Sequence, residues 1–245
     1  MKSILKIIER SQFEFGSLLQ RALDASPLTR QQYQRYLSMQ YHLTRGVQSY
    51  FLRAAAHSDL VRKKRLRKFL FDFANEEEQH YLVAANDLAK LGLPLLEEPF
   101  DVLLWHVYFR SLVDEHPFLR LGAASVLENL SGGSARHITR LALKAPFLNS
   151  ENTKFLVLHQ HEALPHGDQI VSALEAADLS SHQIEQLGLG ARQGMVLYLR
   201  MAEWALFPTS LVAVLDEDEV SNIDAEGRRD SLAIGAVACQ AIVEE

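Results

Sequence analysis

An all-α fold is predicted by helical spacing of apolar residues, by well-placed helix-ending residues and by the lack of alternating strand patterns. Within residues 2–24, Ile4, Ile8, Phe15 and Leu18 recur at intervals of three, four and seven, which gives one apolar stripe. The 245 residues are 48% hydrophobic, enough to bury a core without disulfides. We therefore expect one bundle of about seven to eight helices.

The remaining helices are expected from their start and stop residues. Ser26-Pro27 ends the first helix, and Thr29 is a candidate N-cap for a helix that continues to about residue 57. The third helix is expected from about residue 59 to 90, before Gly92 and Pro94. Five more are expected over roughly 99–114, 118–130, 134–144, 149–177 and 181–207, the last with an N-cap at Ser180 or Ser181.

The domain is thus expected to cover residues 1–207, followed by a tail of different composition over 208–245. The tail contains the acidic run 216–219 and a small apolar segment, 231–243. That segment suits a helix, an edge strand or a docking arm, and the sequence does not choose among them.

Charge and cysteine content exclude several protein classes. A net charge of −6 disfavours a nucleic-acid partner, and the basic run 62–68 is expected to be a solvated helix face. Cys239 is the one cysteine, which fits a reducing compartment. The N-terminus does not resemble a signal peptide, and no apolar run approaches the roughly 18 residues of a membrane span. We expect a cytoplasmic protein with no membrane partner.

Two polar residues interrupt the apolar stripe of the third predicted helix. Leu70, Phe73, Glu77, His80 and Ala84 share one face, so a carboxylate and an imidazole point toward the core. A buried ionised carboxylate requires a compensating partner. Glu-x-x-His is also the spacing with which helix bundles present two ligands to a metal. These two residues are therefore candidate metal ligands.

Two later segments add four more candidates. Glu128 follows a run of small and apolar residues that allows close approach of a neighbouring helix. His159, Glu162 and His166 lie at i, i+3 and i+7, on one helical face. Together the clusters supply three carboxylates and three imidazoles, which suits two iron-type metals.

Each cluster alone has an ordinary explanation. Glu77 and His80 would commonly be a solvated pair, Glu128 a satisfied buried carboxylate, and His159 with His166 a surface pair. Their joint inward placement on three separate helices favours a metal or polar active site over these alternatives.

The order of these motifs resembles the heme-oxygenase-like superfamily of TENA/THI-4 and PQQ-synthase-like helical proteins, and within it the iron-containing, di-iron oxidase-type branch. The resemblance covers about residues 5–207. It depends on Tyr36-Leu37 with Tyr41-His42, on Glu77-x-x-His80, on the segment 122–128 that ends in Glu128, and on the segment 159–166. It implies a non-heme iron oxidase or oxygenase that activates dioxygen against a small organic substrate. One or two Fe ions would be bound by Glu77, His80, Glu128, His159, Glu162 and His166.

One departure from the branch affects the second metal. Related motifs usually have an aspartate four residues after the first histidine of the late segment, where this chain has Ala163. Glu162, one residue earlier, is the residue that could replace this aspartate as a ligand. One iron, a weak second iron and a lapsed site therefore all stay open.

Two other function classes stay open beside the iron enzyme. A metal-free cofactor-modifying enzyme of the PQQ-synthase type is one, and a non-catalytic ligand-binding or regulatory protein of the same fold is the other. Thiaminase-II-like chemistry needs a cysteine near the site, and Cys239 lies in the tail. Heme oxygenases use an axial histidine on the first helix, and residues 2–24 contain none.

The substrate pocket is predicted to include Tyr41, His42, Arg45 and Tyr198, which lie on long helices with mixed faces. Aromatic residues at helical spacing are more often structural. An inward arginine would suit a carboxylate substrate. A homodimer is a further expectation for a bundle of this size.

Overall fold

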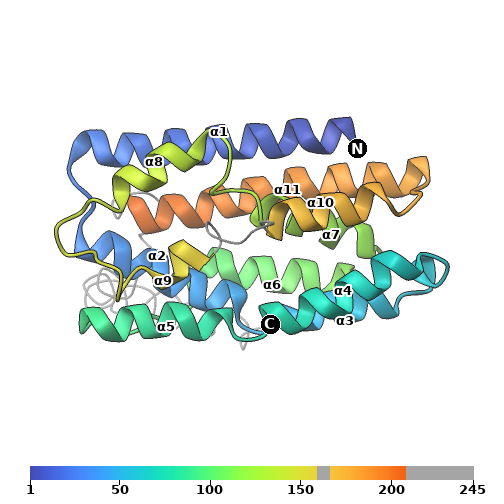
Figure 1. Cartoon of the computed structure of the whole chain (residues 1–245), viewed down its shortest axis with the longest axis horizontal. Helices are drawn as coiled ribbons and strands as arrows, with labels where there is room; N and C mark the ends of the chain where they lie inside the picture. The colour runs from blue at the N-terminus through green and yellow to red at the C-terminus, as the bar shows by residue number, and fades with distance from the viewer. Residues whose placement is uncertain (159–165, 208–245) are drawn as a thin grey trace, which may run out of the picture. The chain divides into compact units, whose positions relative to one another are not determined.

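The computed structural model describes residues 1–158 and 166–207, and every regular element in these two ranges is a helix (Figure 1). The predicted all-α class is confirmed. Residues 1–207 form one compact unit. His159, Glu162 and Ala163 lie outside the described residues, as does the predicted tail 208–245. Within the described ranges, no helix has the length and apolar character needed to cross a membrane.

The helices follow the predicted order closely. Their bounds are α1 Lys2–Ala25, α2 Arg30–Thr44, α3 Gln48–Ala56, the short 3-10 helix η1 Ser58–Leu60, α4 Lys64–Glu77, α5 His80–Leu91, α6 Phe100–Leu112, α7 Pro117–Leu127, α8 Ala135–Ala142, α9 Lys154–Leu158, α10 His166–Glu175 and α11 Ser181–Leu206. Described helices outnumber the expectation because several predicted helices are divided.

The predicted caps form at the starts of α2 and α11 and at the end of α5. Thr29 and Gln32 make a reciprocal capping box at the start of α2, and Ser180 and Gln183 make another at the start of α11. Gly92 ends α5 in the left-handed conformation at φ 66°, where glycine carries no steric penalty.

Two predicted long helices are broken by local backbone conformation. Gly46 adopts φ 79° and separates α2 from α3. The expected helix over 59–90 is divided into η1, α4 and α5, and its second break falls at Glu78 and Gln79. Gln79 has φ −113° and ψ 4°, which leaves the helical region. Glu77 therefore ends one helix and His80 begins the next.

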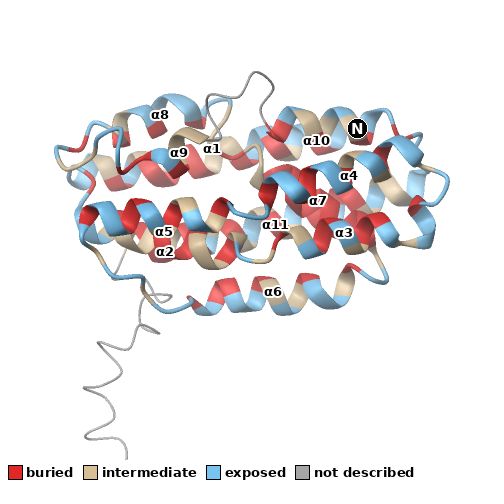
Figure 2. Ribbon diagram, turned by 60° about the horizontal axis from the view of Figure 1, so that its bottom comes forward, coloured by how far each residue is buried: buried red, intermediate tan, exposed pale blue. Residues whose placement is uncertain are grey.

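Close contact between α7 and α11 forms the centre of the core. A Cβ atom on Gly122 would overlap the backbone carbonyl of Leu187, and one on Gly190 would overlap that of Leu119. Only glycine permits this backbone approach. Almost every residue of α7 is buried, as the red central helix of Figure 2 shows. The position of Glu128, directly after α7, is thereby fixed relative to α11.

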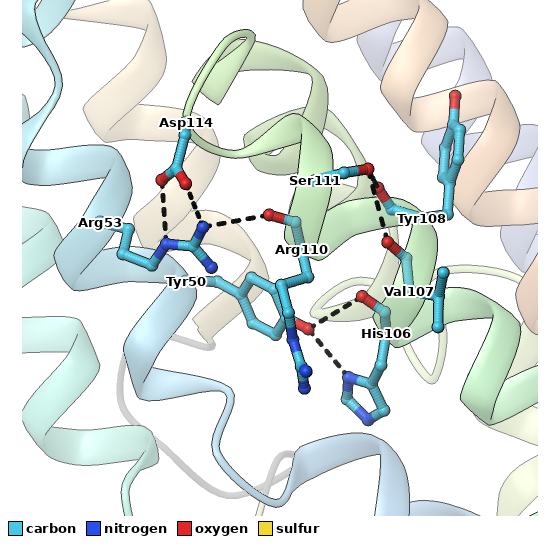
Figure 3. A network of polar contacts seen from close by, with 8 residues as sticks. All are labelled: Tyr50, Arg53, His106, Val107, Tyr108, Arg110, Ser111 and Asp114. Atoms are coloured by element: carbon cyan, nitrogen blue, oxygen red, sulfur yellow. Dashed lines mark hydrogen bonds and ion pairs between the residues drawn. The ribbon is translucent and has the colours of Figure 1, made fainter.

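Polar contacts join α3 to α6 and the turn after it (Figure 3). Arg53 donates from Nε to Asp114 Oδ1 at 2.9 Å and from Nη2 to the Arg110 carbonyl at 3.1 Å. The Tyr50 hydroxyl lies 3.1 Å from His106 Nδ1. These bonds hold α3 and α6 around a buried arginine, Arg120.

Arg120 lies inside an aromatic cage. Its side chain is 1% exposed, and its guanidinium carbon lies 4.8 Å from the ring centre of Tyr50 and 5.5 Å from that of Trp105. Phe51 and Phe109 complete the cage at 5.6 and 5.7 Å. Burial lowers the pKa of Arg120 to about 10, so the side chain is still a cation at neutral pH.

Candidate metal centre

Glu77 is the centre of a buried polar cluster. Its side chain is 2% exposed, at the last position of α4. Oε2 lies 2.7 Å from His80 Nδ1, and Oε1 lies 2.6 Å from His166 Nδ1. One carboxylate is therefore shared by two imidazoles that come from the first residues of α5 and α10.

The two imidazoles are held by packing as well as by the carboxylate. The rings of His80 and His166 stack at 5.5 Å with an interplanar angle of 13°. Phe73, one turn before Glu77, contacts the His166 ring edge-on at 5.0 Å. Gly167 lets α10 approach Asn129, because a Cβ there would overlap the Asn129 side chain. Sequence reasoning missed Gly167, although a glycine beside a candidate ligand was its signal.

Opposing effects set the charge of Glu77. Burial would raise the pKa of this carboxyl, but hydrogen bonding and electrostatic attraction from His166 and His80 lower it to about 2. The carboxylate is thus ionised across the physiological range, as a metal ligand must be.

Two more carboxylates lie around His166. Glu128 Oε2 is 3.8 Å from His166 Nδ1, with its side chain 11% exposed. Glu76 Oε2 is 3.6 Å from His166 Nε2, and its side chain is 53% exposed. Glu128 therefore lies on the inner side of the cluster, whereas Glu76 reaches it from the surface.

The described members of the cluster offer a recognisable donor set. One ligand atom each from Glu77, His80 and His166 lies within 4.8 Å of the others. Two imidazoles and one carboxylate with open positions are typical of non-heme ferrous iron in oxygenases. Four of the six predicted ligands are thus brought together, with Glu128 at the edge. His159 and Glu162 fall outside the described residues.

A small cavity of about 70 Å³ adjoins the cluster. Glu77 and Glu128 form part of its lining, Tyr36, Gln40 and Tyr198 add further polar groups, and apolar side chains such as Phe15, Leu43 and Phe155 form much of the rest. The predicted pocket residue Tyr198 lines this cavity. Tyr36 and Gln40 were not predicted, yet with Leu43 they lie at i, i+4 and i+7 on one face of α2.

The other three predicted pocket residues lie elsewhere. Tyr41 packs edge-on against Tyr81 at 5.4 Å, and His42 Nε2 lies 2.9 Å from the Leu96 carbonyl oxygen. Arg45 is exposed at the C-cap of α2. The face of α2 that meets the cavity is the one that carries Tyr36 and Gln40, and these three residues project from other faces.

Comparison with known proteins identifies the fold. No protein-family model matches this chain, and no curated protein matches it. A solved structure described as a domain of unknown function with a heme oxygenase-like fold, from Shewanella denitrificans OS217, matches with a TM-score of 0.71. The match covers 83% of this chain and 89% of that one at 18% identity. At that identity the likeness establishes the heme-oxygenase-like fold and nothing about activity.

Proposed function

We propose that this heme-oxygenase-like domain is a non-heme iron oxidase or oxygenase that acts on a small organic substrate with dioxygen. The observation that carries the proposal is the buried set of Glu77, His80 and His166, whose ligand atoms lie within 4.8 Å of one another. A cavity lined by Glu77 and Glu128 lies beside it.

Some residues of the cluster would bind the metal, and their neighbours would exclude water from it. Glu77, His80 and His166 would be the ligands, and three protein ligands leave coordination positions for dioxygen. A bound ferrous iron would supply the electrons that dioxygen requires. Phe73 and the buried faces of α4 and α10 would keep bulk water away from the reacting groups.

Metal binding through the Nδ1 atoms would release protons from the imidazoles and would leave Glu76 to orient the His166 ring. Both Nδ1 atoms now face Glu77 oxygens, so a metal there would displace the protons that they share. Metal uptake should release protons to solution. His166 Nε2 would then be oriented by Glu76, 3.6 Å away, as carboxylates commonly orient ligating imidazoles.

Glu128 is the candidate for a fourth ligand, because it lies 3.8 Å from His166 Nδ1 on the cavity side. A second iron would further require His159 and Glu162. The stoichiometry of one or two irons is therefore part of the proposal and is measured by the same experiment.

The experiment is elemental analysis after anaerobic loading with ferrous iron and desalting. We expect about one to two irons per wild-type chain, lost in Glu77→Ala and His80→Ala. Glu78→Ala is the matched control, because Glu78 is exposed and adjacent in sequence. Nitric oxide added to loaded wild type should give the electron paramagnetic resonance signal of a ferrous nitrosyl, which reports an open coordination position.

A competing function has one observation in its favour. Glu77 already contacts both imidazoles, at 2.7 and 2.6 Å, so the cluster compensates its own buried carboxylate. A metal-free enzyme or a ligand-binding protein of this fold would keep such a cluster for structure. Wild type that retains no iron, with Glu77→Ala losing stability alone, would establish that alternative and refute the iron enzyme.

A further inference from the structure

The cavity beside the metal cluster has walls that restrict what it can bind. Its described lining contains two carboxylates, Glu77 and Glu128, and no lysine, arginine or histidine. A carboxylate or phosphate ligand would thus meet no opposite charge on these walls and would pay its full desolvation cost. Arg45, the expected partner for an anionic substrate, is exposed at the end of α2.

Imidazoles already contact the two glutamates. Glu77 lies 2.7 Å from His80 Nδ1 and 2.6 Å from His166 Nδ1, and Glu128 lies 3.8 Å from the same His166 nitrogen. A cationic ligand would have to compete with these imidazoles for the two carboxylates. The described walls suit an uncharged molecule.

A hydrogen-bonded chain of three side chains supplies the specific polar contact. Gln40 donates from Nε2 to the Tyr198 hydroxyl at 2.8 Å, and both Gln40 and Tyr198 hydrogen-bond to Tyr36. Gln40 and Tyr198 are 7% and 4% exposed, so the chain is built into the core.

Both phenols of this chain of side chains meet the cavity, because Tyr36 and Tyr198 line it. A phenol hydroxyl donates one hydrogen bond and can also accept. The cavity wall therefore offers hydroxyl donors to a ligand.

We propose that this cavity is the substrate site for a small uncharged molecule, or the uncharged reacting end of a longer one, with an oxygen or nitrogen that accepts from the hydroxyl of Tyr36 or Tyr198. The inference rests on the proposed function in taking the cavity beside the cluster as the place of reaction. The volume of about 70 Å³ is below the roughly 150 Å³ of an engineered cavity that binds benzene. The ligand portion held here is correspondingly small.

The test uses the metal-free full chain and three probes with the same four-carbon skeleton: butan-2-one, butyrate and n-butylammonium. Binding is followed through the methyl chemical shifts of Leu43 and Val47, two cavity residues. We expect butan-2-one to bind, and each charged probe to bind at least about tenfold more weakly. Butyrate or butylammonium binding as tightly as butan-2-one, or no shift with butan-2-one, would overturn the proposal.

A variant then tests the donor itself. Tyr36→Phe is combined with Tyr198→Phe so that the second hydroxyl cannot substitute. We expect butan-2-one affinity to fall about three- to tenfold, the cost of one hydrogen bond. Tyr41→Phe is the control, because Tyr41 packs against Tyr81 away from the cavity. Unchanged affinity in the double variant would refute the two hydroxyls as donors, and the wild-type probe series decides the ligand class whether or not the variant folds.

Iron plays no part in these measurements, so the two proposals fail separately. A protein that loads iron and binds butyrate best keeps the proposed function and loses this inference. One that binds butan-2-one through these hydroxyls and loads no iron does the reverse.

Discussion

The cluster of Glu77, His80 and His166 and the aromatic cage around Arg120 are two ways of placing charge in one core. In the cluster, opposite partners and hydrogen bonds compensate the carboxylate at 2.6–2.7 Å. In the cage, four aromatic faces surround the guanidinium, and its Nε and Nη1 atoms make no hydrogen bond within the described structure.

The chemistry of the buried groups distinguishes the cluster, a candidate functional site, from the cage, which has a structural role. Imidazole nitrogens and carboxylate oxygens have lone pairs that a metal can use, and Glu77 also faces a cavity. A guanidinium has only donors, and Arg120 is not among the described residues that line that cavity. Burial of charge alone therefore does not indicate function; the chemistry of the groups and access to space do.

The largest expected effect on stability is at Glu77. Glu77→Leu leaves two buried imidazoles without their shared acceptor, and we expect a loss of about 3–5 kcal/mol in the free energy of unfolding at pH 7. Urea denaturation followed by circular dichroism measures it. Glu77→Gln, which keeps the shape and one acceptor oxygen, should lose less. Equal losses in both variants would show that shape rather than charge is responsible.

Iron should stabilise the cluster and leave the cage unaffected. With ferrous iron at a hundredfold excess over its Kd, mass action adds about 2.7 kcal/mol to the stability of wild type. Arg120→Met should show the same rise in melting temperature under anaerobic calorimetry, and Glu77→Gln should show little. A rise that persists in Glu77→Gln would locate the bound iron elsewhere.

The cage should tolerate loss of its charge. Arg120→Met removes the cation–π contacts but also a buried cation, so we expect a change below about 1.5 kcal/mol in either direction. Arg120→Ala, which opens a void between the four rings, should cost about 2–5 kcal/mol. Chemical denaturation of both variants separates charge from volume, and a Met variant as unstable as the Ala variant would assign the stability to the cation.

Asp87 on α5 allows a smaller test through pH. Its side chain is buried and accepts the Phe155 backbone N–H at 2.8 Å, at the start of α9. Burial raises the pKa of Asp87 above its ordinary 3.8, so folding favours the protonated form. Wild type should therefore lose stability relative to Asp87→Asn as pH rises from 3.8 through the raised folded pKa. A stability difference that is constant from pH 3.5 to 7 would contradict this.

The fold could be predicted because its signals are local. Thr29, Ser180 and Gly92 mark helix ends by their own chemistry, and the structure has helix ends at each of them. The breaks at Gly46 and Gln79 were missed. Gln79 carries no sequence signal for a break, and its conformation accompanies the placement of Glu77 and His80 at the ends of two helices.

The site could be predicted in part. Glu77, His80 and His166 were identified because polar residues on an apolar stripe are anomalous, and the structure brings them together. The pocket residues predicted on α2, Tyr41, His42 and Arg45, do not appear in the described lining of the cavity, whereas Tyr36 and Gln40 do. Which face of a helix meets a cavity depends on helix packing across the bundle, and this is not a local property of the sequence.

The break at Glu78 and Gln79 makes the buried His80 the first residue of a helix. Helix α5 receives no side-chain cap at Gln79, and the first-turn amides of any helix lack acceptors within it. Amide hydrogen exchange should therefore be fast around residues 79–81 and slow in α7 and α11, where Gly122 and Gly190 allow the backbones to touch. Metal binding at the cluster should therefore slow amide hydrogen exchange at this break. The measurement requires no knowledge of the substrate.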